Sequence, residues 1–253
     1  ELEQRGRPLG RRPNDAKDCW SVQRLGEELI KIGFKAVDGW NSVWVLDMGE
    51  NYKACFVVYV DDLVMFGSER IKDIIKELRK TINMDEPAAL QKYLGCVHEI
   101  THTFNNGERL TKVVFNMTNY IQSALEQYAE VSKGKISKAD SPYAPKLADE
   151  EVEKLLSEPG DLAPHAASLI MKLMYAARMA CPFISTIVSK LSSRVTRWTK
   201  EDDRRLHRVY CFLSTHSKMT LQGSLSSQDL QEFWLGAWPD ADYCGDMYHA
   251  RST

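Results

Sequence analysis

The chain has 253 residues, of which 43% are hydrophobic and 27% charged, so it can bury one large core or two smaller ones. This composition is close to that of average globular proteins and excludes collagen-like, low-complexity and disordered classes. The net charge of −2 gives no overall attraction to nucleic acids or membranes, so any basic binding surface must be local.

The sequence shows neither a membrane span nor a signal peptide. Its longest uncharged apolar run, residues 54–60, is too short to cross a bilayer, and its first residues are polar. The six cysteines show no close pairing, which favours reduced, buried thiols in an intracellular protein. They are Cys19, Cys55, Cys96, Cys181, Cys211 and Cys244. Glu1 and Thr253 are not obvious termini, so we expect a piece of a longer protein.

The first third of the chain reads as a helix followed by strands. Residues 1–18 are basic and rich in turn formers, and apolar periodicity from Cys19 predicts a helix that Gly33 ends. Strand-like runs follow at residues 42–46, 54–60 and 63–66. Only Asp61 and Asp62 separate the last two runs, which predicts a tight hairpin.

The middle of the chain alternates between helix and strand signals. Ser68 is predicted to cap a helix that runs to Ile82. Strands are expected at 93–100 and 110–115, joined by a turn at 105–107, and a helix through Tyr128 follows. Trp20, Trp40 and Trp44 fall at amphipathic positions and are expected in the core.

Residues 132–163 are acidic and contain prolines, which indicates a linker with one short helix and a domain boundary. The chain beyond is mostly helical. Thr199-Lys-Glu-Asp202 predicts a capping box for a helix that ends near Thr215. Strand-like runs at 219–221 and 233–238 come last.

The segment Tyr59-Val-Asp-Asp62 carries the clearest chemical signal. Two carboxylates between apolar strands are costly to bury unless they reach water or a cation. Divalent cations prefer such oxygen ligands, and phosphoryl transfer uses them to hold two metals. An Asp-Asp pair is also ordinary turn chemistry, so the pair alone does not identify a metal site.

The context of this pair resembles a known family. Tyr59-Val-Asp-Asp-Leu-Val-Met-Phe-Gly67, then a helix, then Tyr93-Leu-Gly-Cys96, resembles the reverse transcriptases of copia-type LTR retrotransposons. Later segments are similar to further motifs of that family in the same order, and together they cover almost the whole chain. These are Asn119-Tyr-Ile-Gln-Ser-Ala-Leu-Glu-Gln-Tyr128, Ser141-Pro142, Met174-Tyr-Ala-Ala-Arg-Met-Ala-Cys-Pro-Phe-Ile184, and Trp238-Pro-Asp-Ala-Asp-Tyr-Cys-Gly-Asp246 with Arg251-Ser-Thr253.

The resemblance implies an α+β fold with four regions. Residues 1–131 would form a partial reverse-transcriptase palm, an antiparallel sheet backed by helices, and would include the primer-grip hairpin. An acidic linker at 132–163 would precede a mainly helical thumb or connection region at 164–218. Residues 219–253 would supply the first strands of a ribonuclease H-like domain.

The resemblance also implies roles for individual residues. Asp61 and Asp62 match the catalytic aspartates, and with Asp240 of the ribonuclease H-like segment they would bind Mg²⁺ or Mn²⁺. Tyr93, Leu94 and Gly95 match the primer grip. Arg11 and Arg12 follow Leu9-Gly10 in a segment that would contact the template.

The implied partners are an RNA template, a DNA primer, deoxynucleoside triphosphates and the rest of the Pol polyprotein, with no membrane. The implied location is the virus-like particle in the cytoplasm, or the nucleus.

Residues 183–218 contain eight Lys or Arg and three acidic residues. On composition alone this is either a solvated helical surface or a surface that binds phosphates. The resemblance favours the second, with Arg197, Arg204, Arg205 and Arg208 as the nucleic-acid-binding side chains. In that arrangement the acidic linker around Glu151 turns away from the phosphates.

Two functions therefore stay open. The parent activity implied by the resemblance is RNA-directed DNA polymerisation, but the family's third carboxylate belongs to a strand upstream of Gly10 that this sequence lacks. The chain by itself is therefore not expected to extend a primer. The alternative is a non-catalytic nucleic-acid-binding remnant of a decayed element.

Four histidines show no metal-ligand spacing with any cysteine and are expected to be structural. They are His98, His102, His207 and His216.

Overall fold

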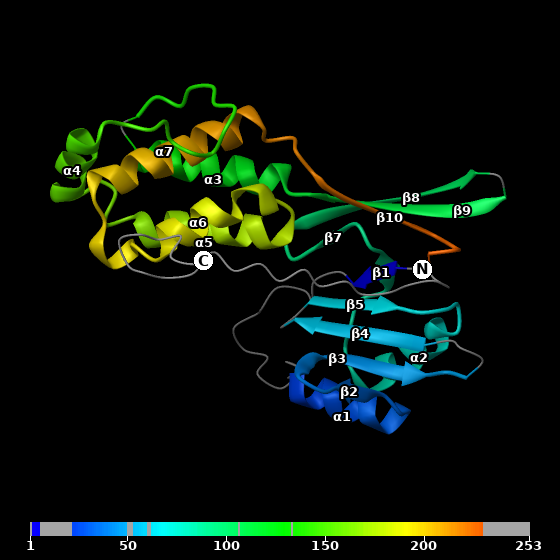
Figure 1. Cartoon of the computed structure of the whole chain (residues 1–253). Helices are drawn as coiled ribbons and strands as arrows, with labels where there is room; N and C mark the ends of the chain where they lie inside the picture. Colours follow the sequence, from blue (N-terminus) through cyan, green and yellow to red (C-terminus); the bar gives the residue numbers. More distant parts are fainter. Residues whose placement is uncertain are drawn as a thin grey trace. The chain divides into compact units, whose positions relative to one another are not determined.

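The structure is a computed structural model that describes residues 2–5, 22–49, 53–59, 62–105, 107–132 and 134–229. This part of the chain is mixed α/β, with seven α-helices and two antiparallel sheets (Figure 1). The chain divides into two compact units, the larger made of residues 1–99 and 113–222 and the smaller of residues 100–112 and 223–253. Within the described residues, no helix combines the length and apolarity that a membrane span requires.

The first sheet has six strands in the order β2-β3-β4-β5-β1-β6. Its strands are β1 (Leu2–Arg5), β2 (Lys35–Val37), β3 (Trp40–Asp47), β4 (Lys53–Tyr59), β5 (Asp62–Phe66) and β6 (Pro87–Ala89). Strand β1 pairs antiparallel with both β5 and β6. Together with helices α1 (Val22–Ile32) and α2 (Ile71–Thr81), strands β1, β4, β5 and β6 therefore follow the split β-α-β-β-α-β topology.

One face of this sheet is covered by α1 and α2, as Figure 1 shows. Alternate residues of β4, Ala54, Phe56 and Val58, are buried in one core with the apolar stripes of the two helices, because side chains of a strand alternate between its faces. Gly26 allows α1 to approach the sheet closely, since a Cβ atom there would lie 3.0 Å from the Trp44 ring.

The second sheet has the strand order β10-β9-β8-β7. Its strands are β7 (Lys92–Tyr93), β8 (Cys96–Asn105), β9 (Glu108–Asn116) and β10 (Leu221–Ser226). Strands β7 and β8 pair antiparallel, with Tyr93 opposite Cys96. Cys96 is fully buried, so the start of β8 belongs to the core of the helical region.

Most of the remaining chain is helical. It contains α3 (Thr118–Val131), α4 (Asp149–Ser157), α5 (Ala166–Met179), α6 (Ser185–Ser192), α7 (Lys200–Thr215) and the short 3-10 helices η1 (Pro182–Ile184) and η2 (Val195–Arg197). Helices α3, α5, α6 and α7 share one core (Figure 1), in which the Tyr128 and Tyr210 rings stack with centroids 4.0 Å apart. This core crosses the expected boundary at 132–163, because α3 packs with the helices beyond it.

Most predicted elements are present. The strands expected at 42–46, 54–60 and 63–66 are β3, β4 and β5, and the capping box of Thr199 and Asp202 begins α7. The short helix of the acidic segment is α4. Gly33 ends the first helix in a left-handed conformation, with φ 103°.

Five local predictions are wrong. The strand expected at 93–100 is interrupted by a turn at Leu94 and Gly95, which separates β7 from β8. Residues 2–5 form β1, because backbone pairing with β5 and β6 outweighs their lack of an apolar pattern. Ser68 does not cap α2, since its Oγ atom has no hydrogen-bond partner, although its carbonyl accepts the Ile71 N–H. Trp40, at the start of β3, is 67% exposed. The strand expected at 219–221 begins only at Leu221, and 233–238 and Trp20 lie outside the described residues.

We expect Leu173→Ala to lower the free energy of unfolding by about 2–5 kcal/mol, because the fully buried Leu173 side chain of α5 would leave a cavity in the helical core. Met171→Ala on the same helix is the control, since Met171 is 61% exposed and its truncation should change stability by less than about 0.5 kcal/mol. Urea unfolding measures both. Equal losses in the two variants would contradict the assigned burial.

Candidate functional site

The β4–β5 hairpin presents Asp62 at one end of the six-stranded sheet. The two strands pair as far as Tyr59 and Asp62, and the three residues after Asp62 are buried. Asp62 is half-buried, and no described residue donates a hydrogen bond to it or forms an ion pair with it. A carboxylate in this position is suited to a cation supplied from outside the chain.

The turn between β7 and β8 has an unusual backbone. Leu94 and Gly95 connect the paired residues Tyr93 and Cys96, and both have positive φ, 49° and 79°. Leu94 is the one residue other than glycine with positive φ in the described part of the chain. Two-residue hairpin turns of this kind favour Asn-Gly or Gly-Gly, so leucine here carries a strain on the order of 1–2 kcal/mol.

A tyrosine from α5 contacts this turn. The Tyr175 hydroxyl donates a hydrogen bond to the Leu94 carbonyl, and the Tyr175 ring packs against Tyr120 of α3 with centroids 5.2 Å apart. Both rings pack against the helical core. The turn is therefore fixed to the helical core through a side chain 81 residues later in the sequence.

The turn and the β4–β5 hairpin interact electrostatically. The pKa of the Tyr93 phenol is raised to about 12, mainly by burial and with smaller contributions from Asp62, Tyr175 and Tyr59. Burial also raises the pKa of Tyr175, to which Tyr59 and Asp62 contribute. Asp62 thus lies near Tyr93 and Tyr175, and Tyr175 also contacts the turn.

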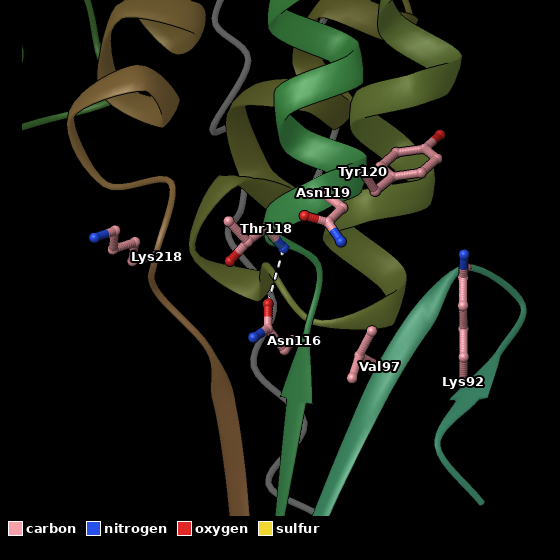
Figure 2. A pocket seen from close by; sticks show the side chains of 8 residues that line it. Lys92, Val97, Asn116, Thr118, Asn119, Tyr120 and Lys218 are labelled. Atoms are coloured by element: carbon pink, nitrogen blue, oxygen red, sulfur yellow. Dashed lines mark hydrogen bonds between the residues drawn. The ribbon is translucent and has the colours of Figure 1, made fainter.

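A pocket of about 620 Å³ lies beside the same turn (Figure 2). Its lining residues are Lys92, Gly95, Val97, Asn116, Thr118, Asn119, Tyr120 and Lys218. The Asn116 side chain accepts the Thr118 N–H at 2.9 Å and so satisfies one donor at the start of α3. Two lysines and no acidic residue line the pocket, which therefore favours an anionic group.

The described residues contain only part of the predicted metal and template sites. Asp62 has the oxygen-donor chemistry that Mg²⁺ and Mn²⁺ prefer. Asp61, Asp240, Arg11 and Arg12 lie outside the described residues. Within the described residues, no three His, Cys, Asp or Glu side chains form a group that could hold a metal.

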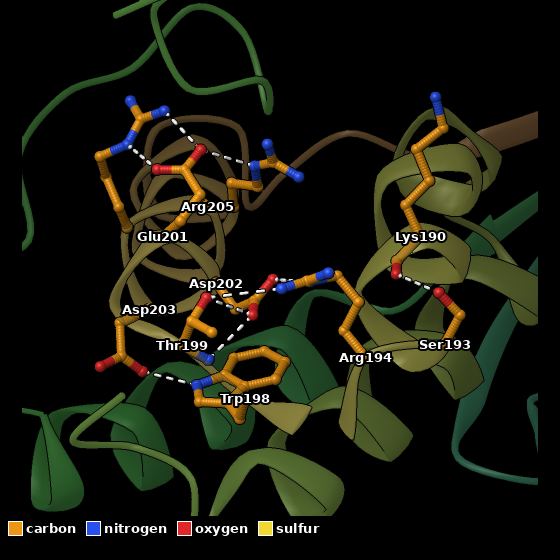
Figure 3. Close-up of polar contacts among 10 residues, drawn as sticks. Lys190, Ser193, Arg194, Trp198, Thr199, Glu201, Asp202, Asp203 and Arg205 are labelled. Atoms are coloured by element: carbon orange, nitrogen blue, oxygen red, sulfur yellow. Dashed lines mark hydrogen bonds and ion pairs between the residues drawn. The ribbon is translucent and has the colours of Figure 1, made fainter. Parts of the chain in front are cut away.

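Two carboxylates of the first turn of α7, Glu201 and Asp202, accept hydrogen bonds from neighbouring side chains (Figure 3). Asp202 is fully buried, and it accepts hydrogen bonds from Arg194 and from the Thr199 N–H. Glu201 is 1% exposed and accepts two bonds from Arg204, at 2.7 and 2.8 Å, and one from Arg205 at 2.8 Å. The positive end of the helix dipole also favours negative charge in this turn.

Three of the four arginines that the sequence assigns to nucleic acid have partners within the chain. Arg204 and Arg205 neutralise the buried Glu201, and Arg208 donates to the Ser141 carbonyl at 2.9 Å. The fourth, Arg197, is exposed. The phosphate-binding role of this set stays a prediction.

The acidic segment contacts α7 through Arg204, which donates a hydrogen bond to the Pro145 carbonyl at 2.9 Å. Hydrogen bonding to Glu201 mainly raises the pKa of Arg204, and Glu151 of α4 contributes. That this segment turns away from bound phosphates stays a prediction.

Sequence reasoning missed a polar network around His207. Its Nδ1 atom lies 2.8 Å from the Tyr128 hydroxyl, and its Nε2 atom lies 3.4 Å from Cys211 Sγ. The i, i+4 spacing of His207 and Cys211 was the available signal. Among the described cysteines, all four are free, with Cys96, Cys181 and Cys211 buried and Cys55 half-buried, as the sequence predicted.

Comparison with protein-family models, with curated proteins and with solved structures gave no match.

We expect Arg204→Leu to lower the free energy of unfolding by about 2 kcal/mol, because it removes two hydrogen bonds from the buried Glu201 carboxylate and one from the Pro145 carbonyl. Arg197→Leu makes the same substitution at an exposed site and should change stability by less than about 0.5 kcal/mol. Urea unfolding at neutral pH compares the two. An Arg204→Leu variant as stable as the control would contradict an anchoring role.

Glu201 should make stability depend on pH. Burial opposes its ionisation, but hydrogen bonds from Arg204 and Arg205 outweigh burial and lower its pKa below the ordinary value of 4.5. A lowered pKa in the folded state stabilises the protein above about pH 4.5, and this stabilisation disappears as pH falls through the folded-state pKa. The stability difference between the parent chain and Glu201→Gln should therefore shrink below about pH 4.5. Urea unfolding across pH 3–7 measures this difference, with Glu77→Gln at an exposed position of α2 as the control substitution.

Proposed function

We propose that this chain is the palm and thumb portion of a reverse transcriptase of the copia-type retrotransposon family, and that it binds an RNA–DNA hybrid beside Asp62. The observation that carries the proposal is that Tyr93, 31 residues after Asp62, lies near enough for that carboxylate to raise its pKa, while the Tyr175 hydroxyl holds the adjoining turn through the Leu94 carbonyl. The split β-α-β-β-α-β topology around the hairpin is compatible with a polymerase palm.

The parent reaction would be attack of the primer 3′-hydroxyl on the α-phosphate of a deoxynucleoside triphosphate, with pyrophosphate as the leaving group. Asp62, with Asp61, would hold Mg²⁺ or Mn²⁺, and the bound cations would neutralise charge on the phosphates. The turn would position the primer strand. The pocket beside it supplies Lys92 and Lys218, which suit a backbone phosphate.

The test is fluorescence anisotropy with a labelled RNA–DNA hybrid that has a recessed DNA 3′ end. We expect Mn²⁺ together with the complementary deoxynucleoside triphosphate to tighten binding about tenfold relative to EDTA, or about 1.4 kcal/mol. Asp62→Asn should remove this metal-dependent increase because it removes a carboxylate ligand. Asp73→Asn is the control, since the Asp73 side chain is 82% exposed on α2.

Three results are informative. Binding that depends on metal and on Asp62 supports the polymerase assignment. Hybrid binding that is indifferent to both metal and Asp62 supports the non-catalytic remnant instead. Absence of any hybrid binding contradicts both functions.

A further inference from the structure

We propose that Tyr175 is a positioning residue of the nucleic-acid site, whose hydroxyl holds the Leu94-Gly95 turn in the conformation that faces the strand. The contribution to nucleic-acid binding rests on the function proposed above. The contact between Tyr175 and the turn does not, and it can be tested separately.

The local sequence does not favour this turn. Leu94 has φ 49°, in the left-handed region that leucine rarely adopts, and it occupies the first of the two turn positions. Such a conformation persists only where surrounding structure enforces it, and it is found preferentially at functional sites. A contact from outside the hairpin is therefore required to explain the turn.

Tyr175 supplies that contact from a fixed base. Its hydroxyl donates to the carbonyl of Leu94 itself, the residue with the unfavourable φ. The Tyr175 ring is held by Tyr120 and by the helical core, so the hydroxyl has little freedom to move. On the other side of the turn, the fully buried Cys96 belongs to the same core. The two ends of the turn are thus fixed to one rigid group of helices.

The fixed turn leaves Gly95 accessible. A Cβ atom added at Gly95 would meet no atom within 4 Å, and Gly95 lines the pocket with Lys92 and Tyr120. A strand lying in the pocket would therefore meet the Gly95 backbone, whose direction depends on the Leu94 peptide. Because the Tyr175 hydroxyl binds that peptide, it controls how the turn is presented to the strand without touching the strand itself.

The experiment compares Tyr175→Phe with Tyr120→Phe. Both changes remove one hydroxyl from the same pair of packed rings, but only the first removes the bond to Leu94. Backbone amide exchange, followed by NMR, should become about tenfold faster at Gly95 and Cys96 in Tyr175→Phe and should be unchanged in Tyr120→Phe. Affinity for the RNA–DNA hybrid should fall about three- to tenfold in Tyr175→Phe. The affinity control is Tyr143→Phe, since Tyr143 is exposed and does not line the pocket, and it should bind the hybrid like the parent chain.

A rescue variant separates positioning from general packing. Asparagine adopts the left-handed conformation more readily than leucine, so Leu94→Asn should stabilise the turn without the tyrosine hydroxyl. The double variant Tyr175→Phe, Leu94→Asn should therefore recover most of the lost hybrid affinity and slow the amide exchange. A purely structural role of Tyr175 in the helical core would not be rescued by a change in the turn.

Amide exchange tests whether Tyr175 holds the turn, and hybrid affinity tests whether this contact contributes to nucleic-acid binding. If Tyr175→Phe leaves amide exchange at Gly95 and Cys96 as it is in Tyr120→Phe, the inference is wrong, whatever the hybrid does. If the parent chain binds no hybrid, the proposed function fails, and the exchange comparison alone decides whether Tyr175 holds the turn. Faster exchange with unchanged hybrid affinity would refute the role in nucleic-acid binding.

Discussion

The helical core depends on the neutralisation of two buried carboxylates at the start of α7. Glu201 and Asp202 are almost completely removed from solvent, and an unpaired charge in such a position would strongly destabilise the fold. Arg194, Arg204 and Arg205 supply the opposite charges. Since α7 carries much of the apolar surface that packs on α3, α5 and α6, the geometry of this first turn determines how the whole core is aligned.

Two arginines of α7 also contact a segment outside the helix. Arg204 and Arg208 also bind carbonyls of the segment 141–145, so the chain between α3 and α4 is held along α7. Cys211 and Thr215, further along α7, accept the N–H groups of Ser137 and Ala139. The stretch 183–218, which composition presents as basic, therefore uses several of its arginines for contacts within the chain. Charge counts along a sequence do not distinguish such contacts from a phosphate-binding surface.

The candidate site differs from the first turn of α7, because its residues come from separate elements of the chain. Asp62 comes from a hairpin whose register two apolar strands define, and the Leu94-Gly95 turn is joined to the helical core. Tyr175 connects the turn to α5. The Asp62 carboxylate contributes to the raised pKa values of Tyr93 and Tyr175. The described residues thus hold a carboxylate suited to a cation and a pocket suited to an anion.

The sequence by itself determined the strands around Asp62, the turn between β8 and β9 and the capping box of α7. Alternation, turn residues and capping pairs act over a few residues, and these signals are therefore readable locally. Only the tertiary structure decided the place of β1, the partners of Arg204 and Arg208, and the contact of Tyr175 with Leu94. The cited contacts join groups that are 59 or more residues apart in the sequence. Whether a polar side chain is solvated or paired depends on the groups that the fold places next to it.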